Sequence, residues 1–187
     1  MKKSFREILI SAIALMGIAA VVTAALAATN MLTQDKIAAM LAEKENTART
    51  EVIADAEFEQ ATLVVDGKTI EYHVAKRDGE TVGYVFTVVS KGKGSGLKVM
   101  TGVDVFGQVL GVKITDDNET AGYIDKLKAA DDKRDGKCFF DELIGKVWED
   151  VETVDKVTNA TKTSLGVRDA VKTALKYYDL VKGGDAA

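Results

Sequence analysis

The chain begins with a long apolar run and continues in shorter alternating patterns. No charged residue occurs from Ile8 to Ala28. As a helix rising about 1.5 Å per residue, this run can cross the roughly 30 Å hydrocarbon core of a bilayer. It predicts a transmembrane anchor over residues 1–29. Lys2, Lys3 and Arg6 precede the run; the positive-inside rule places them in the cytoplasm. We therefore expect a single-pass protein of the cell (inner) membrane whose main domain is periplasmic or extracellular.

A cleaved signal peptide is the alternative for this segment. A basic start precedes the run, and Ala25-Leu26-Ala27 has the small-x-small form of a cleavage site. The run exceeds the roughly 7–15 apolar residues usual in signal peptides, which favours a retained anchor. Small residues recur at helical spacing, a pattern typical of helices that pack on other membrane helices. They are Ser11, Gly17, Ala20 and Ala24.

The patterns after the anchor predict a helical linker and then a sheet. Residues 30–57 contain a charged helical stretch from Asp35 to Thr50, with a thin apolar stripe of Ile37, Met40 and Leu41. Five runs with strand character follow, separated by turn signals at Asp66-Gly67 and Phe106-Gly107. They are Thr62–Val65, Lys68–Val74, Thr81–Ser90, Leu97–Asp104 and Gln108–Thr115. This order predicts a mostly antiparallel sheet.

Helical patterns close the chain. Ile124–Ala130 and Cys138–Leu143 are short, whereas Thr161–Lys182 is long and amphipathic. The apolar face of the long helix is made of Ser164, Val167, Val171, Ala174 and Tyr178. Strands first and helices afterwards indicate an α+β fold for residues 58–187, with helices flanking the sheet.

Composition narrows the function classes. The 187 residues are 47% hydrophobic and carry a net charge of −4, which suits one ordinary core beside the anchor. The acidic balance argues against nucleic acid as a partner. Cys138 is the only cysteine, and its neighbours Phe139 and Phe140 predict a buried apolar environment. The single His73 has no Cys or His partner at ligand spacing, so no metal site is expected.

Two loops look like binding motifs but lack the required spacing. Gly92–Gly96 has neither the GxxxxGK[ST] order of a P-loop nor the GxGxxG order of a dinucleotide fold, and it predicts a flexible hairpin connection. Asp131–Gly136 does not continue as an EF-hand calcium loop and is expected to be solvated.

A cluster of hydroxyl residues, Thr158 to Ser164, begins the last helix. The local sequence favours an ordinary helix N-cap. The same place also presents backbone N–H groups and the positive end of the helix dipole, which can hold a phosphate. Ala160 would let a bulky group approach, and Thr163 and Ser164 could donate hydrogen bonds to it.

The pattern Asp155-x-x-Thr158-x-Ala160-Thr161-x-Thr163 is similar to the attachment motif of the FMN-binding domain family. That family includes the G subunit of the Rnf ion-translocating electron-transport complex and the C subunit of the sodium-translocating NADH:quinone reductase. Its members carry FMN joined through the phosphate to the threonine that follows the alanine, placed there by a dedicated flavin transferase. The resemblance implies covalent FMN on Thr161. It also implies a cofactor environment made of Thr158, Asn159, Ala160, Thr163 and Ser164.

Other segments resemble motifs of the same family and occur in the same order along the chain. They are Val82–Phe86, Met100–Asp104 with Gly107, and Glu119-Thr120-Ala121-Gly122, where the family usually has Glu-Thr-Pro-Gly-Leu-Gly. The resemblance implies cofactor contacts from Glu119, Thr120 and Gly122. Tyr123 replaces the leucine, and we hypothesise that it stacks on the isoalloxazine ring. Asn159 replaces a glycine and is expected to adopt the left-handed conformation, which Asn tolerates.

The resemblance implies an electron carrier. It would be a redox subunit of a complex that couples electron flow between ferredoxin and NAD to sodium or proton transport, with the other membrane subunits as partners. No convergent acid, base and nucleophile set occurs, so it is not expected to be a stand-alone catalyst. The short spacing between anchor and motif favours the Rnf G subunit over the C subunit of the quinone reductase. A non-redox binding domain in which Thr161 only caps a helix is the other alternative.

Overall fold

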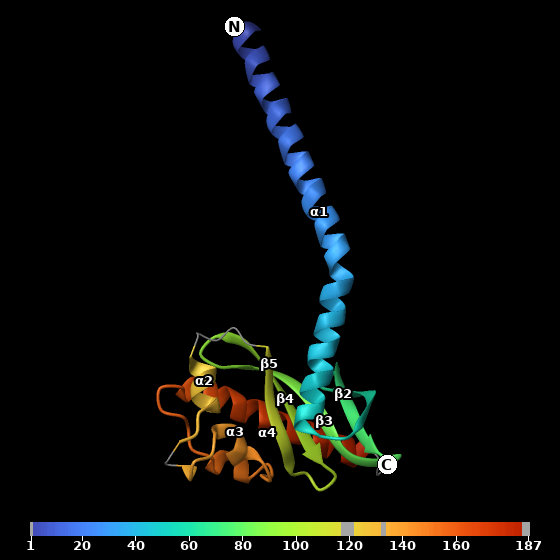
Figure 1. The fold of residues 1–187 in the computed structure, drawn as a ribbon, viewed down its shortest axis with the longest axis vertical. Helices are drawn as coiled ribbons and strands as arrows, with labels where there is room; N and C mark the ends of the chain where they lie inside the picture. Colours follow the sequence, from blue (N-terminus) through green and yellow to red (C-terminus); the bar gives the residue numbers. More distant parts are fainter. Residues whose placement is uncertain (1, 117–121, 132–133, 185–187) are drawn as a thin grey trace. The chain divides into compact units, whose positions relative to one another are not determined.

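The computed structural model describes residues 2–116, 122–131 and 134–184 (Figure 1). The chain divides into two compact units, Met1–Lys44 and Glu45–Ala187. A single helix, α1 (Lys2–Val52), makes up the described part of the first unit and contributes its last turns to the second.

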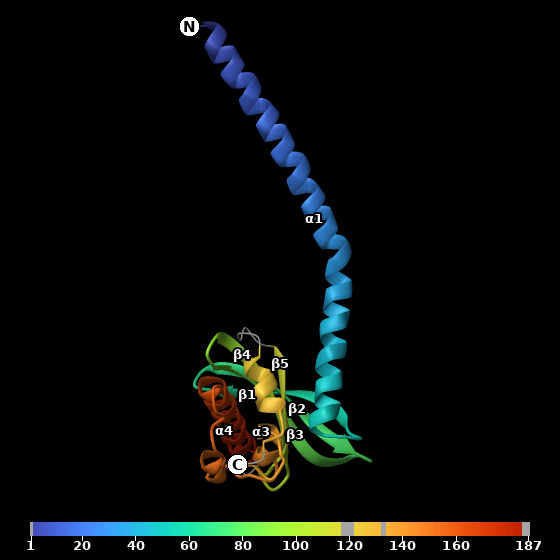
Figure 2. The ribbon, with the colours of Figure 1, turned by 60° about the vertical axis from the view of Figure 1, so that its left-hand side comes forward.

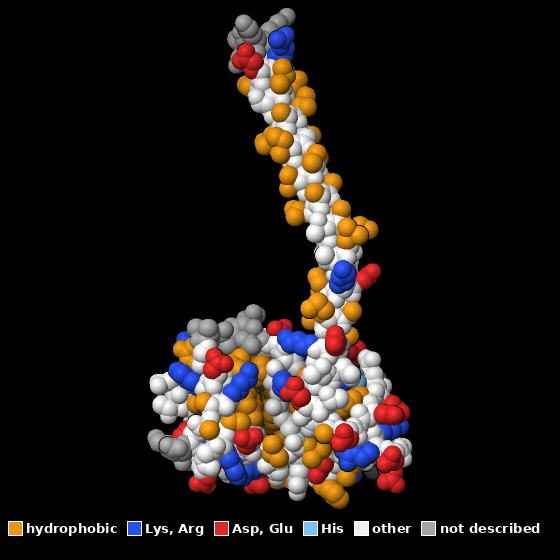
Figure 3. Space-filling view, viewed as in Figure 1, with side chains coloured by type: hydrophobic (Ala, Val, Ile, Leu, Met, Phe, Trp, Pro, Cys, Tyr) orange, Lys and Arg blue, Asp and Glu red, His pale blue; other side chains and the backbone are white. Residues whose placement is uncertain are grey.

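Helix α1 exposes its apolar side chains in the first unit. All its large apolar residues from Ile8 to Leu26 are exposed, and orange side chains cover its visible side in Figure 3. The helix is long and apolar enough to cross a membrane, and it runs unbroken through Ala25-Leu26-Ala27. The stripe of Ile37, Met40 and Leu41 is also exposed. Such a continuous apolar surface is typical of a helix that contacts lipid or other helices.

The second unit contains a five-stranded sheet in the order β1-β2-β3-β4-β5, with every neighbouring pair antiparallel. The strands are β1 (Glu57–Val65), β2 (Lys68–Arg77), β3 (Glu80–Lys91), β4 (Ser95–Asp104) and β5 (Val109–Asp116). All five predicted strands are confirmed. At the β1–β2 turn Asp66 and Gly67 have φ of 50° and 74°, as a two-residue hairpin requires. Strand β1 begins earlier than predicted because its first half is a polar edge, which pairs without an apolar alternation.

Helices cover one face of this sheet (Figure 2). They are α2 (Tyr123–Lys128), α3 (Phe139–Leu143), the one-turn 3₁₀ helix η2 (Asp150–Thr153) and α4 (Thr161–Gly184). The three predicted helices and the α+β class are confirmed, while η2 was too short to show a period. All five residues predicted for the inner face of α4 are buried. They pack on sheet residues that include Phe86, Leu97 and Val99.

The last turns of α1 cover the opposite face. Ala48, Val52 and Ile53 form a second apolar cluster with sheet residues such as Val85 and Met100. Beneath them lie two glycines that are direct partners across β4 and β5, Gly102 and Gly111. A Cβ added to Gly111 would lie 2.8 Å from the backbone of Val52, and one on Gly102 would lie 3.0 Å from the Val52 carbonyl oxygen. The missing side chains therefore make room for the helix end.

Cys138 corrects one expectation from the sequence. Its side chain is half-buried rather than enclosed, because the residue caps the start of α3. Its backbone N–H donates to the Asp141 carboxylate at 3.1 Å. Partial burial raises the pKa of the thiol above its usual range, which keeps it protonated at neutral pH.

Replacing Gly111 by Ala should lower the free energy of unfolding by about 2 kcal/mol, because the new methyl meets helix backbone that cannot rotate away. Thermal denaturation of the detergent-purified full chain would measure the loss. Gly183→Ala is the matched control, since that glycine faces open space, and it should change stability by less than about 0.5 kcal/mol. Equal melting of both variants would contradict the close approach.

Candidate functional site

The hydroxyl cluster forms a tight turn followed by the first turn of α4. The Ala160 N–H donates to the Val157 carbonyl at 3.0 Å, and Asn159 between them has φ of 61°. The expected left-handed conformation of Asn159 is therefore confirmed. The Ser164 N–H donates to the Ala160 carbonyl at 2.9 Å, which is the first hydrogen bond of the helix. Ala160 thus occupies the N-cap position, and Thr161 is the first helical residue.

Ser164 closes this turn from inside the core. Its hydroxyl accepts the Val157 N–H at 3.3 Å and donates to the Thr161 carbonyl at 2.9 Å. The side chain is completely buried. Of the predicted cofactor residues, Ser164 therefore has its hydroxyl engaged within the fold, where it fixes the turn that carries Thr161. Thr158 is exposed on the turn and does not line the cavity described next.

A small cavity of about 200 Å³ opens at the start of α4. Three segments line it: the β3–β4 loop through Lys93, the start of α2 through Tyr123, and residues 159–163. The structure thus brings together Tyr123, Asn159, Ala160, Thr161 and Thr163 from the predicted set. Ala160 and Thr163 are buried, while Thr161 is exposed. Among the described residues that line this cavity, Thr161 is the one hydroxyl-bearing residue that is exposed.

The remaining predicted residues belong to the segment before α2. Gly122 is the N-cap of α2 with φ of 87°, a conformation that favours glycine, and it does not line the cavity. Glu119 and Thr120 lie outside the described residues. The proposed stacking of Tyr123 on a flavin ring stays a prediction.

The cavity has a positive electrostatic character. Lys93 and Lys162 line it, and Lys126 lies 5.4 Å from the centroid of the Tyr123 ring. The first turn of a helix adds backbone N–H groups without partners inside the helix and the positive end of its dipole. A phosphate group fits this set of donors and charges. At about 200 Å³ the cavity is below the roughly 300–1,000 Å³ of pockets that enclose larger ligands, so it suits the phosphate end of a nucleotide.

The β3–β4 loop reaches the cavity because α4 packs directly on its base. A Cβ added to Gly166 would lie 2.8 Å from the Lys91 carbonyl oxygen and 3.1 Å from the Gly92 nitrogen. The Ser90 hydroxyl donates to the Gly166 carbonyl at 2.7 Å. The loop joins β3 to β4 as predicted, but the sequence did not reveal that it is packed against a helix or that Lys93 belongs to the site.

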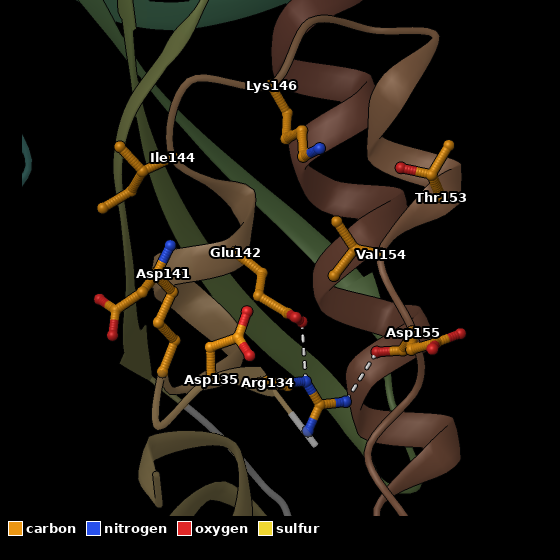
Figure 4. Close-up of a pocket in the computed structure, with 10 residues that line it drawn as sticks. Arg134, Asp135, Asp141, Glu142, Ile144, Lys146, Thr153, Val154 and Asp155 are labelled. Atoms are coloured by element: carbon orange, nitrogen blue, oxygen red, sulfur yellow. Dashed lines mark hydrogen bonds and ion pairs between the residues drawn. The ribbon is translucent and has the colours of Figure 1, made fainter. Parts of the chain in front are cut away.

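A second, more polar cavity of about 380 Å³ lies beside α3 and η2 (Figure 4). Its buried Arg134 donates to the Glu142 carboxylate at 2.7 Å, to the Asp131 carboxylate at 2.8 Å and to the Asp155 carbonyl at 3.0 Å. The solvated character predicted for Asp131–Gly136 holds for the exposed Asp135 and Gly136 but not for the buried Arg134, while Asp132 and Lys133 lie outside the described residues. The Arg134 partners stand 3, 8 and 21 residues away in the sequence, and a charged stretch of this kind gives no signal that its arginine is buried among them.

These contacts fix the segment that leads into Thr161. Arg134 binds the Asp155 carbonyl, and Arg168 from α4 donates to the Val154 carbonyl at 3.1 Å. Two guanidinium groups thus hold neighbouring carbonyls just before the turn. Within the second cavity, Arg134 and Glu142 form a structural ion pair, and the cavity shares no lining residue with the one at Thr161.

Two family models match the chain. The FMN-binding domain matches residues 92–176, and the RnfG N-terminal region matches residues 1–52. The first range contains every residue that lines the cavity at Thr161. The second corresponds to α1.

The known proteins that this chain resembles over much of its length point to the same family as the family models. The chain is 30% identical over 179 residues to the G subunit of the Na⁺-translocating ferredoxin:NAD⁺ oxidoreductase complex of Acetobacterium woodii, covering 86% of each chain. It is 29% identical over 116 residues to the G subunit of the ion-translocating oxidoreductase complex of Vibrio vulnificus, covering 56% of this chain and 55% of the relative. For the corresponding protein of Haemophilus influenzae the identity is 30% over 106 residues, covering 52% and 51%. These matches confirm the resemblance inferred from the motifs.

Asn159→Val should destabilise the chain by about 1–2 kcal/mol, because a β-branched residue is strained in the left-handed region. Asn159→Gly should stay within about 0.5 kcal/mol of the original chain, since glycine adopts this conformation freely. Thermal denaturation of the full chain in detergent gives both values. Identical midpoints for Val and Gly would show that the turn does not need the positive φ.

Arg134→Met should lower stability by about 2 kcal/mol. This is less than the loss for a fully enclosed pair, because the partner carboxylates of Asp131 and Glu142 are 40% and 26% exposed and can regain water. Lys137→Met, on an exposed residue of the same cavity, is the control and should change stability by less than about 0.5 kcal/mol. Urea unfolding gives the free energy of unfolding of both variants. Equal values would contradict a structural role for Arg134.

Proposed function

This chain belongs to the family of G subunits of the Rnf-type ion-translocating oxidoreductase complexes, and we propose that it is the membrane-anchored subunit that relays electrons through FMN. The observation that carries the proposal is the cavity at the start of α4. It joins an accessible hydroxyl, two lysines and a helix N-terminus inside the segment that matches the FMN-binding domain.

We propose that FMN is attached to Thr161 through a phosphoester bond. Thr161 is exposed, lines the cavity and stands at the first position of α4 rather than at its cap. That position supports attachment over the alternative in which Thr161 merely caps the helix. Thr163 and Asn159 line the same cavity and would surround the phosphate.

Attachment needs an activated flavin phosphate and a flavin transferase. The Thr161 oxygen would form a new bond to the FMN phosphorus, while a phosphoanhydride bond of a flavin dinucleotide donor breaks and a nucleoside monophosphate leaves. The transferase would accept the hydroxyl proton. This exchange of bonds involves no oxidation or reduction, so the flavin is delivered with its redox chemistry intact.

A covalent tether suits a carrier outside the cytoplasm. A cofactor that dissociated there would be diluted, whereas a tether keeps its local concentration high whatever the affinity of the ring. The flavin supplies one- and two-electron chemistry when bound. The described residues of the cavity offer no acid, base and nucleophile arranged for substrate turnover. The electron donor and acceptor would therefore be neighbouring subunits of the complex.

The anchor would hold this domain at the membrane. We propose that α1 is retained and spans the bilayer once with its start in the cytoplasm, because basic residues precede the apolar run and the helix continues unbroken into the second unit. The complex would couple electron flow between ferredoxin and NAD to the transport of sodium ions or protons. The relatives described above are all G subunits, which favours this assignment over the C subunit of a quinone reductase.

Thr161→Ala should abolish flavin attachment, because no other hydroxyl occupies the same position. The full chain would be expressed with its flavin transferase, purified from membranes and compared by intact mass and by in-gel flavin fluorescence after denaturation. The original chain should carry an added FMN-sized mass that the variant lacks. Thr158→Ala, on an exposed hydroxyl outside the cavity, is the control and should stay fluorescent. An original chain with neither flavin fluorescence nor added mass would contradict attachment and leave Thr161 with a structural role only.

A further inference from the structure

The β3–β4 loop contributes a lysine with an unusual partner. The Lys93 ammonium donates a hydrogen bond to the Tyr123 hydroxyl at 2.5 Å and lies 4.2 Å from the centroid of the same ring. Several lysines of the domain pair with carboxylates, as Lys98 does with Glu45 at 2.7 Å. In the part of the chain that the structure describes, no ion pair involves Lys93.

A phenol is a weaker partner for an ammonium group than a phosphate. A phosphate adds the Coulombic attraction between opposite charges to its hydrogen bond with the ammonium, whereas the phenol contributes only a neutral oxygen and its ring face. Lys93, Tyr123 and Thr161 line one cavity. A phosphate that reached Thr161 would therefore offer Lys93 a better partner within the same space.

The loop that carries Lys93 is held in place before any ligand arrives. Gly166 of α4 packs against Lys91 and Gly92, and the Ser90 hydroxyl donates to the Gly166 carbonyl at 2.7 Å. These contacts fix the base of the loop. The hydrogen bond to Tyr123 then fixes the end of a flexible side chain that would otherwise lose rotamer freedom on binding.

We infer that Lys93 is the counter-ion of the cofactor phosphate at Thr161, and that Tyr123 is a positioning residue that holds the Lys93 ammonium at the cavity before attachment. This inference rests on the proposed attachment of FMN to Thr161. It assigns the glycine-rich β3–β4 loop to the site and gives Tyr123 a role that does not involve the flavin ring.

Amine labelling of the intact membrane protein tests the contact directly. Full chains carrying FMN and the Thr161→Ala variant would be treated with an acetylating reagent, and the modification of each lysine quantified by peptide mass spectrometry. Lys93 should be about fivefold less reactive in the flavin-loaded chain, because its ammonium is paired with phosphate. Lys128, exposed at the end of α2 and outside the cavity, should react equally in both. Equal labelling of Lys93 in both chains would overturn the inference.

The rate of FMN attachment distinguishes an effect of the Lys93 charge from an effect of side-chain packing. With purified flavin transferase, Lys93→Gln should slow FMN incorporation about fivefold at low salt, and Lys93→Arg should stay within about twofold of the original rate. Tyr123→Phe keeps the ring but loses the hydroxyl. It should slow incorporation about twofold in the original chain and have no effect in the Lys93→Gln background, as residues that act through one another do.

The outcomes distinguish the two proposals. Normal incorporation into Lys93→Gln would overturn the role of Lys93 while leaving attachment at Thr161 intact. Equal slowing by Gln and Arg would indicate that packing rather than charge matters, and would also overturn it. Failure of the original chain to acquire FMN would overturn both. Lys128→Gln is the matched control for loss of one surface charge and should incorporate FMN at the original rate.

Discussion

The close contact between Gly166 and the backbone at Lys91 and Gly92 is the constraint on which the candidate site depends. Helix α4 can lie this near to the β3–β4 loop only because position 166 has no Cβ, and the Ser90 hydroxyl secures the approach by donating to the Gly166 carbonyl. The N-terminus of α4 and the loop are far apart in the sequence. Their contact places Lys93 in the same cavity as Thr161. The candidate site is thus assembled by helix packing from segments that are far apart in the sequence, and not by one continuous motif.

On both faces of the sheet, a helix comes close to its neighbour because a glycine leaves room for the contact. On one face α4 approaches the loop at Gly92, and on the other the end of α1 lies on Gly102 and Gly111. Ion pairs from Glu45 to Lys98 and from Glu51 to Lys113 flank the second contact. Exposed pairs of this kind stabilise little. The helix end is therefore held mainly by apolar contacts, which are possible because the two glycines leave room for it. Because Ala48 and Val52 pack on the sheet, the end of α1 from Glu45 onward is part of the folded domain.

Local patterns in the sequence predicted most of the fold but only part of the site. The hairpin at Asp66-Gly67 and the inner face of α4 follow from turn chemistry and helical period, and both are found. The left-handed Asn159 was expected from the family resemblance, where glycine stands at this position, and from the tolerance of Asn for this conformation. In contrast, the Lys93–Tyr123 pair and the hydrogen bond from Arg134 to the Asp155 carbonyl join residues 30 and 21 positions apart. A hydroxyl at the start of a helix has the same sequence signal whether it faces a ligand or the core, so the sequence could not show that the Ser164 hydroxyl bonds the backbone of Val157 and Thr161.

The cavity also indicates how such a carrier could separate retention of the cofactor from its redox tuning. About 200 Å³ of space, two lysines and the first turn of α4 suit a phosphate group. These charges act at the attached end of the cofactor, and their influence falls with distance and with screening by salt. The flavin potential would instead depend on groups around the isoalloxazine ring. If FMN is tethered by its phosphate as proposed, the ring environment would be free to differ among family members while the chemistry at the helix N-terminus keeps the flavin bound.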